Sequence, residues 1–159
     1  MKNLLVIGAS VFMMTSLSAH EVTVKVALTP AGNFEAKSAK VKGEVKKNGA
    51  GFTAENLWVK TDELKTGIDL RDEHFHKHLN AAQFPKITFT QLTAADGKGT
   101  GTLSINDVKK PVPFTYKSAG ANKIEAKFTV KPSEFKLKEA NYMGIGVTDS
   151  VDVVAIIEV

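Results

Sequence analysis

The sequence predicts an all-β domain of antiparallel strands with one short helical segment inserted among them. Apolar and polar residues alternate with a period of two over most of the chain, as they do in strands that bury one face. Eight such extended runs lie within residues 20–159, separated by segments rich in Gly, Pro, Asn and Asp. Many short strands with regular turn signals are typical of an antiparallel barrel or sandwich.

Residues 1–19 are predicted to be a signal peptide that is removed from the mature domain, residues 20–159. Lys2 supplies a positive charge, an apolar stretch runs from Leu4 to Met14, and small residues lead up to Ala19. This apolar stretch is only about half of the roughly 20 residues that a membrane-spanning helix requires. The signal-peptide pattern predicts export. Because the mature chain has no second long apolar run, we expect no membrane span.

The composition excludes several classes of function. The chain of 159 residues has no cysteine, which rules out disulfide scaffolds, thiolate metal sites and cysteine nucleophiles. Its formal net charge is +4, but among 21 basic residues only Arg71 is an arginine. Nucleic-acid readers rely on the planar, bidentate arginine side chain, so we expect no nucleic acid partner and interpret the lysines as a solvated surface.

The first three strands are predicted from alternation and turn residues. Val22, Val24, Val26 and Leu28 define one buried face of the first strand. The second extended run, residues 34–45, changes phase, which predicts a β-bulge near Ser38. A hairpin turn at residues 48–51 leads to the third run, residues 52–61.

The remaining strands follow the same pattern. They are expected at residues 86–93, 100–106, 108–118, 122–131 and 151–159. Asn106 and Asp107 predict a tight hairpin, and Pro111 and Pro113 restrict the strand after it to an edge or to positions whose N–H faces solvent. The glycine-rich residues 97–101 lack phosphate-loop spacing, and we interpret them as structural.

Residues 69–82 are predicted to be a helix or helical loop that covers the mouth of the barrel. Phe75, Leu79 and Ala82 form one stripe at helical spacing, Asp69 is placed to cap the helix, and Pro85 marks its end. Covering segments of this kind often carry function.

A cluster of histidines in this helix suggests a metal site as an alternative function. His74 and His78 are one helical turn apart, with Asp69 or Glu73 as further donors, while His76 would point away. The opposing interpretation is a partly exposed helix face, because no cysteine and no second histidine cluster complete the site.

Arg71 and Asp72 allow two interpretations. They form either a partly buried ion pair that anchors the helix to the barrel, or, through Arg71 with His74 close by, a contact to a ligand head group. Catalysis has little support, since the chain lacks a G-x-S-x-G nucleophile elbow, and we predict no catalytic residue and no cofactor.

Several segments resemble the signatures of one known family. Residues 66–74 (TGIDLRDEH) match T-G-x-x-x-R-D-x-H, and residues 84–89 (FPKITF) match F/Y-P-x-I-x-F. Residues 101–112 (GTLSINDVKKPV) resemble a G-x-L-T-I-x-G-V-T-K-P-V hairpin, and residues 149–151 (DSV) resemble a closing G-D-x-V strand. In these segments the chain resembles the YceI-like family of secreted lipid-binding proteins. It departs from the family pattern at residues 29–33, where a D-x-x-H-S element is absent, and at residues 131–136, which replace N-R-x-D-F-G.

The resemblance implies an extended, lipocalin-like, eight-stranded antiparallel barrel that holds a polyisoprenoid or similar long-chain amphiphilic lipid in an apolar cavity. It also implies a periplasmic, non-enzymatic protein that often forms a homodimer. An eight-stranded barrel encloses either packed side chains or one small ligand. The candidate cavity residues, each of which could equally be plain core, are Phe34, Phe52, Phe75, Leu79, Phe84, Phe89, Leu103, Ile105, Phe114, Phe128, Val130 and Phe135.

Overall fold

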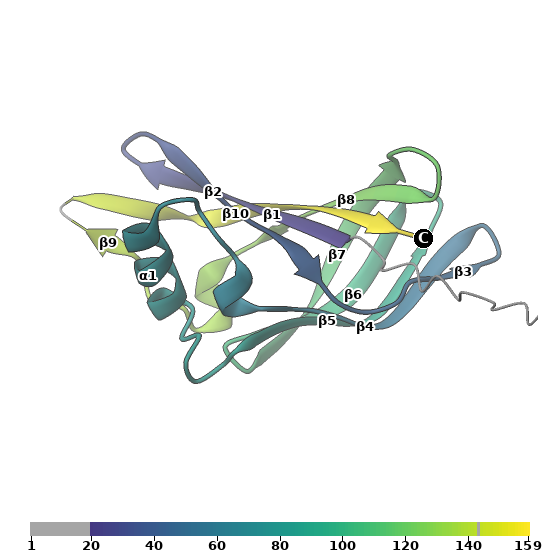
Figure 1. Cartoon of the computed structure of the whole chain (residues 1–159), viewed down its shortest axis with the longest axis horizontal. Coiled ribbons are helices and arrows are strands. Elements are labelled where there is room, and N and C mark those ends of the chain that lie inside the picture. The colour runs from purple at the N-terminus through teal and green to yellow at the C-terminus, as the bar shows by residue number, and fades with distance from the viewer. Residues whose placement is uncertain (1–19, 143) are drawn as a thin grey trace, which may run out of the picture.

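The computed structural model describes residues 20–142 and 144–159, so the predicted signal peptide lies outside the described residues. The described chain forms ten strands, one α-helix and two short 3-10 helices (Figure 1). Their bounds are β1 (His20–Thr29), β2 (Asn33–Val41), β3 (Lys46–Asn48), β4 (Gly51–Lys60), η1 (Thr61–Glu63), α1 (Asp69–His78), β5 (Lys86–Ala95), β6 (Lys98–Ile105), β7 (Val108–Ser118), β8 (Lys123–Val130), η2 (Pro132–Phe135), β9 (Asn141–Tyr142) and β10 (Ile145–Glu158).

The strands form one antiparallel sheet that curls into a barrel. The order is β2-β1-β10-β8-β7-β6-β5-β4-β3, with the two-residue strand β9 paired to β10. Backbone hydrogen bonds between Lys42 and Trp58, of 2.7 and 2.9 Å, join β4 to the residue that follows β2. A second pair of backbone bonds joins Lys37 to Lys65. The all-β barrel prediction is therefore confirmed, with eight long strands and two short additions, β3 and β9.

Local sequence signals place the turns and the bulge. Asn106 and Asp107 both have positive φ, at 53° and 60°, as a two-residue hairpin turn of type I′ requires. The pairing of β1 with β2 shifts between His20, opposite Val41, and Val22, opposite Ser38. One extra residue in β2 at this point is the predicted bulge.

The helical insertion leaves and rejoins the sheet at one place. Lys60 at the end of β4 pairs with Lys86 at the start of β5, so η1 and α1 belong to an excursion between neighbouring strands. The helix ends at His78, earlier than predicted, because Asn80 adopts a left-handed conformation with φ of 53°. Ala81 N–H then donates to the carbonyl of His76 in a Schellman motif. The expected cap is also wrong, since Asp69 is the first helical residue and Ile68 is the N-cap.

One half of the barrel interior is filled by aromatic rings. Phe89 stacks on Phe128 with ring centroids 5.7 Å apart and meets Phe114 edge-on at 5.9 Å. Two glycines of β6 make room for this aromatic plug, which also includes Phe52 and Tyr116. A Cβ at Gly99 would lie 2.2 Å from Phe114, and a Cβ at Gly101 would lie 2.8 Å from Phe89.

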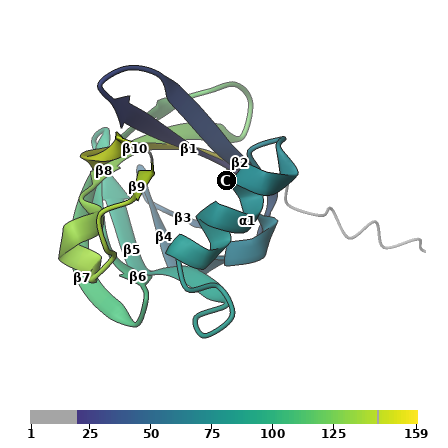
Figure 2. The ribbon, with the colours of Figure 1, turned by 90° about the vertical axis from the view of Figure 1, so that its left-hand side faces the viewer.

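The helix covers the end of the barrel that is opposite the C-terminus (Figure 1). Seen along the barrel, the strands form a ring, and α1 lies across one side of it (Figure 2). Near the C-terminus, the buried His20 ring joins the two ends of the domain. Its Nε2–H donates to the carbonyl of Gly43 at 3.1 Å, and its Nδ1 accepts from the N–H of Glu158 at 3.2 Å. No helix in the described part of the chain has the length and apolar character needed to cross a membrane.

Candidate functional site

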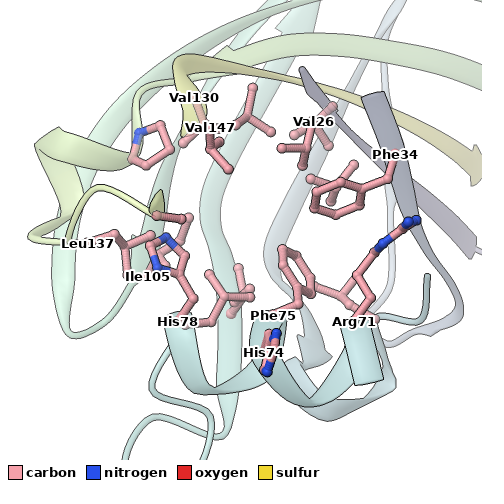
Figure 3. A pocket seen from close by; sticks show the side chains of 18 of the residues that line it. Val26, Phe34, Arg71, His74, Phe75, His78, Ile105, Val130, Leu137 and Val147 are labelled. Atoms are coloured by element: carbon pink, nitrogen blue, oxygen red, sulfur yellow. The ribbon is translucent and has the colours of Figure 1, made fainter. Parts of the chain in front are cut away.

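A cavity of about 860 Å³ occupies the half of the barrel beside α1 (Figure 3). Of its 26 lining residues, 21 are apolar, so the space suits a hydrocarbon rather than a polar ligand. Two neighbouring strands supply much of the wall. The side chains from β1 are Val22, Val24, Val26 and Leu28, and those from β10 are Ile145, Val147, Val151 and Val153.

The cavity exists because short aliphatic side chains line this half of the barrel. Successive residues of a strand face opposite sides, so each inward position contributes one side chain to the interior. In this half the inward valines and leucines leave space along the barrel axis, whereas the rings of Phe89, Phe114 and Phe128 fill the other half. Phe128 forms the boundary, since it lines the cavity and stacks on Phe89 of the aromatic plug.

The helix α1 closes part of the mouth and carries most of its polar groups. Phe75 and the C-cap residue Leu79 add to the apolar wall, while Arg71, His74, Lys77 and His78 supply nitrogen atoms. Figure 3 shows Arg71, His74 and His78 beside Phe75 at the rim of the cavity. The ring of Phe75 meets the ring of Phe34 on β2 edge-on, at a centroid distance of 6.0 Å and an angle of 86°. The Arg71 guanidinium lies 5.1 Å from the centroid of the same Phe34 ring.

Asp72 anchors the start of α1 through Thr66. Its Oδ1 accepts a hydrogen bond of 2.6 Å from the Thr66 backbone N–H and one of 2.7 Å from the Thr66 hydroxyl. These two bonds hold the pKa of the Asp72 carboxyl below its usual value. The suggested ion pair between Arg71 and Asp72 does not form, because Asp72 faces Thr66 while Arg71 faces the cavity.

The three clustered histidines point in different directions. His76 Nε2 forms a hydrogen bond of 2.7 Å with the carbonyl oxygen of Leu64, away from the cavity, as the helical spacing predicts. His74 and His78 both line the cavity. Burial lowers the pKa of His78, so its imidazole is neutral near pH 7.

The metal-site alternative receives no support from this geometry. Within residues 20–142 and 144–159, no group of three or more histidine and carboxylate side chains is placed to hold a metal ion. Glu73, one of the suggested donors, instead forms an ion pair of 3.0 Å with Lys77.

The structure brings seven of the twelve candidate cavity residues to the wall and places the other five elsewhere. The seven are Phe34, Phe75, Leu79, Leu103, Ile105, Phe128 and Val130. Phe52, Phe89 and Phe114 belong to the aromatic plug, and Phe135, only 1% exposed, lies in the core beside the cavity. Phe84 is partly buried outside the wall, where its carbonyl accepts a hydrogen bond from the Thr61 hydroxyl.

The sequence-based list missed the aliphatic wall. The candidate residues are mostly aromatic, yet the valines of β1 and β10 supply six of the 26 lining residues. The signal that could have found it is the alternation of Val22, Val24 and Val26, matched by Val151 and Val153 on the neighbouring strand.

Comparison with known proteins places the chain in a family. The family model of the YceI-like domain matches residues 12–159. No curated protein sequence matches the chain.

A polyisoprenoid binding domain from Saccharophagus degradans, implicated in plant cell wall breakdown, has a similar structure, with a TM-score of 0.62 at 15% identity over 89% of this chain and 98% of that chain. A mutant CJ YCEI protein is also similar, with a TM-score of 0.65 at 22% identity over 80% of this chain and 85% of that chain. A second mutant of that protein, with a monobromobimane guest, matches over the same shares of the two chains, with a TM-score of 0.62 at 21% identity. The chain belongs to the YceI-like family.

Proposed function

We propose that this protein binds a polyisoprenoid or another long-chain amphiphilic lipid in the cavity between β1, β10 and α1. The observation that carries the proposal is the apolar cavity of about 860 Å³, closed on one side by the aromatic plug and bordered on the other by polar groups of α1. An amphiphile fits this arrangement, with its chain against the valines and its head group at the rim. The fold shared with a polyisoprenoid binding domain supports the same ligand class.

Apolar contact is sufficient for tight binding of such a ligand. Each CH₂ group moved from water into the cavity contributes about 0.8 kcal/mol, so a chain of about 15 carbons contributes on the order of 12 kcal/mol before the entropic cost of binding. Chain length rather than a strong polar anchor then determines most of the affinity.

The proposed role is carriage, storage or sequestration in the periplasm, without chemical conversion of the lipid. Among the described residues that line the cavity, the polar side chains are Arg71, His74, Lys77, His78 and Asn141, and none supplies a hydroxyl or carboxylate. Catalysis by a serine, threonine or carboxylate nucleophile would require such a group beside the ligand. The predicted signal peptide supports export, and the family resemblance supports a homodimer.

Native mass spectrometry of the protein purified from an exporting host tests the proposal directly. We expect a subunit mass that begins at His20, one bound amphiphile per subunit, and an assembly of two subunits. Organic extraction then identifies the lipid class. A protein that carries no lipid, and that fails to take up a long-chain amphiphile added in solution, would refute the binding role.

A matched pair of variants separates binding in the cavity from binding to the surface. Val24 lines the cavity, and Lys25, its neighbour in β1, is exposed on the other side of the sheet. Val24→Asp places a charge against the lipid chain and should abolish retention, whereas Lys25→Asp should retain the lipid. If Val24→Asp fails to fold, Val24→Phe keeps the wall apolar and reduces the volume, and it should lower the amount of bound lipid.

A further inference from the structure

Four of the five polar side chains that line the cavity come from α1. Arg71, His74 and His78 follow each other at intervals of three and four residues, and all three border the cavity (Figure 3). Lys77 lines the rim beside them. The remaining polar lining residue, Asn141, is uncharged and lies in β9.

The formally charged side chains of this lining, Arg71 and Lys77, are both cationic. None of the lining residues in the described chain is Asp or Glu. Two of the three acidic residues of α1 are engaged elsewhere, since Asp72 accepts hydrogen bonds from Thr66 and Glu73 pairs with Lys77. The third, Asp69, does not line the cavity. The charge of Lys77 is therefore partly balanced at the surface, where the side chains of both partners are more than half exposed.

Arg71 is the cation that this arrangement leaves without a counter-charge. It takes part in none of the ion pairs within residues 20–142 and 144–159. Its guanidinium lies over the Phe34 ring at 5.1 Å, and the residue is partly buried and lines the cavity. A partly desolvated guanidinium recognises carboxylate and phosphate oxygens through paired N–H donors.

The neighbouring imidazoles fit the same ligand. A neutral imidazole carries one N–H donor, and His78 is neutral near pH 7 because of its burial. His78 lies two helical turns from Arg71, at the far side of the mouth (Figure 3). Donors therefore border the mouth along the length of α1, and acidic acceptors do not.

We propose that the bound amphiphile carries an anionic head group, a carboxylate or a phosphate, which Arg71 contacts at the mouth of the cavity. This inference rests on the proposed lipid-binding function and specifies the ligand of that same site.

Amphiphiles that share one chain and differ in their head group test the inference. The first set is a long-chain fatty acid and the corresponding fatty alcohol, and the second is geranylgeranyl phosphate and geranylgeraniol. Affinities for the delipidated mature protein are measured by displacement of a neutral fluorescent naphthylamine probe. A charge-assisted hydrogen bond predicts that at least one anionic ligand binds about tenfold to 100-fold more tightly than its alcohol. The two sets distinguish a carboxylate from a phosphate.

The variants assign the preference to one residue. In Arg71→Gln the anionic preference should fall to about threefold or less, and in Arg71→Lys part of it should return. Lys46→Gln on β3 removes the same charge at the other end of the barrel and should leave the preference unchanged.

Each outcome separates this inference from the function on which it rests. Equal affinity for anionic and neutral ligands would overturn the anionic head group and leave lipid binding intact. An anionic preference that survives in Arg71→Gln would overturn the role of Arg71. Failure of every amphiphile to displace the probe, in a protein that also carries no extracted lipid, would refute lipid binding itself.

Discussion

Replacing Phe34 with alanine should release α1 from the β1–β2 hairpin and open the mouth of the cavity. Phe34 joins two contacts across the mouth, the edge-on ring pair with Phe75 at 6.0 Å and the Arg71 guanidinium at 5.1 Å. The ring pair is worth about 0.5–1.5 kcal/mol and a partly exposed cation–π contact about 0.5–1 kcal/mol. Their sum, roughly 1–2.5 kcal/mol, corresponds to a change of about 5- to 70-fold in the equilibrium between closed and open helix.

Native-state hydrogen exchange measures this equilibrium residue by residue. The backbone N–H groups of Asp72 and Leu79 are bonded inside the helical segment, to the carbonyls of Ile68 and Phe75. We expect these amides to exchange about 5- to 70-fold faster in Phe34→Ala, while amides of the aromatic plug keep their protection. An amphiphile should also dissociate faster from this variant, because α1 covers its exit.

Two control variants test whether the contacts of the Phe34 ring hold α1 in its closed position. Phe34→Leu keeps an apolar side chain but removes the ring, so it should restore only part of the protection. Glu35→Gln changes the neighbouring, exposed position of β2 and should leave α1 unaffected. If α1 is protected equally in Phe34→Ala and Glu35→Gln, the ring contacts do not hold the helix and this reasoning is wrong.

Two further predictions concern the anchor of α1 and the room for the aromatic plug. The pKa of Asp72 is lowered by its hydrogen bonds, so its ionised form adds stability that is fully present above about pH 4 and is lost as the pH falls through the lower folded pKa. In thermal melts Asp72→Asn should be less stable than the wild type near neutral pH by about 1–2 kcal/mol, and a deficit that does not shrink in acid would contradict this account. Gly99→Ala would place a Cβ 2.2 Å from the Phe114 ring, and urea unfolding should show a loss of about 1–3 kcal/mol. Gly146→Ala, where the nearest atom is 3.8 Å away, is the matched control, and equal losses in the two variants would count against the close approach as the cause.

The strands and turns of this protein could be predicted from the sequence because their causes are local. Alternation at Val22, Val24 and Val26 defines one face of a strand whatever lies opposite. Asn106 and Asp107 tolerate the positive φ of a tight hairpin, and the phase change near Ser38 required an extra residue in the pairing. The helical insertion was also predictable, whereas its cap and its last residue were not, because the left-handed conformation of Asn80 ends the helix before the apolar stripe does.

Contacts between distant strands determine which inward residues surround the cavity and which fill the barrel. Phe89 and Phe128 both occupy inward positions in alternating strands. Phe89 packs against rings from other strands and over Gly101, which has no side chain, whereas Phe128 also borders the cavity. In the same way, Asp72 lies beside Arg71 in the sequence yet bonds to Thr66, which leaves Arg71 at the mouth. The strand pattern, the main turns and the place of the helix depend on neighbours along the chain, so the amino-acid sequence alone predicts them. The cavity and the charge at its mouth depend on side chains brought together from separate strands, and no local pattern records those contacts.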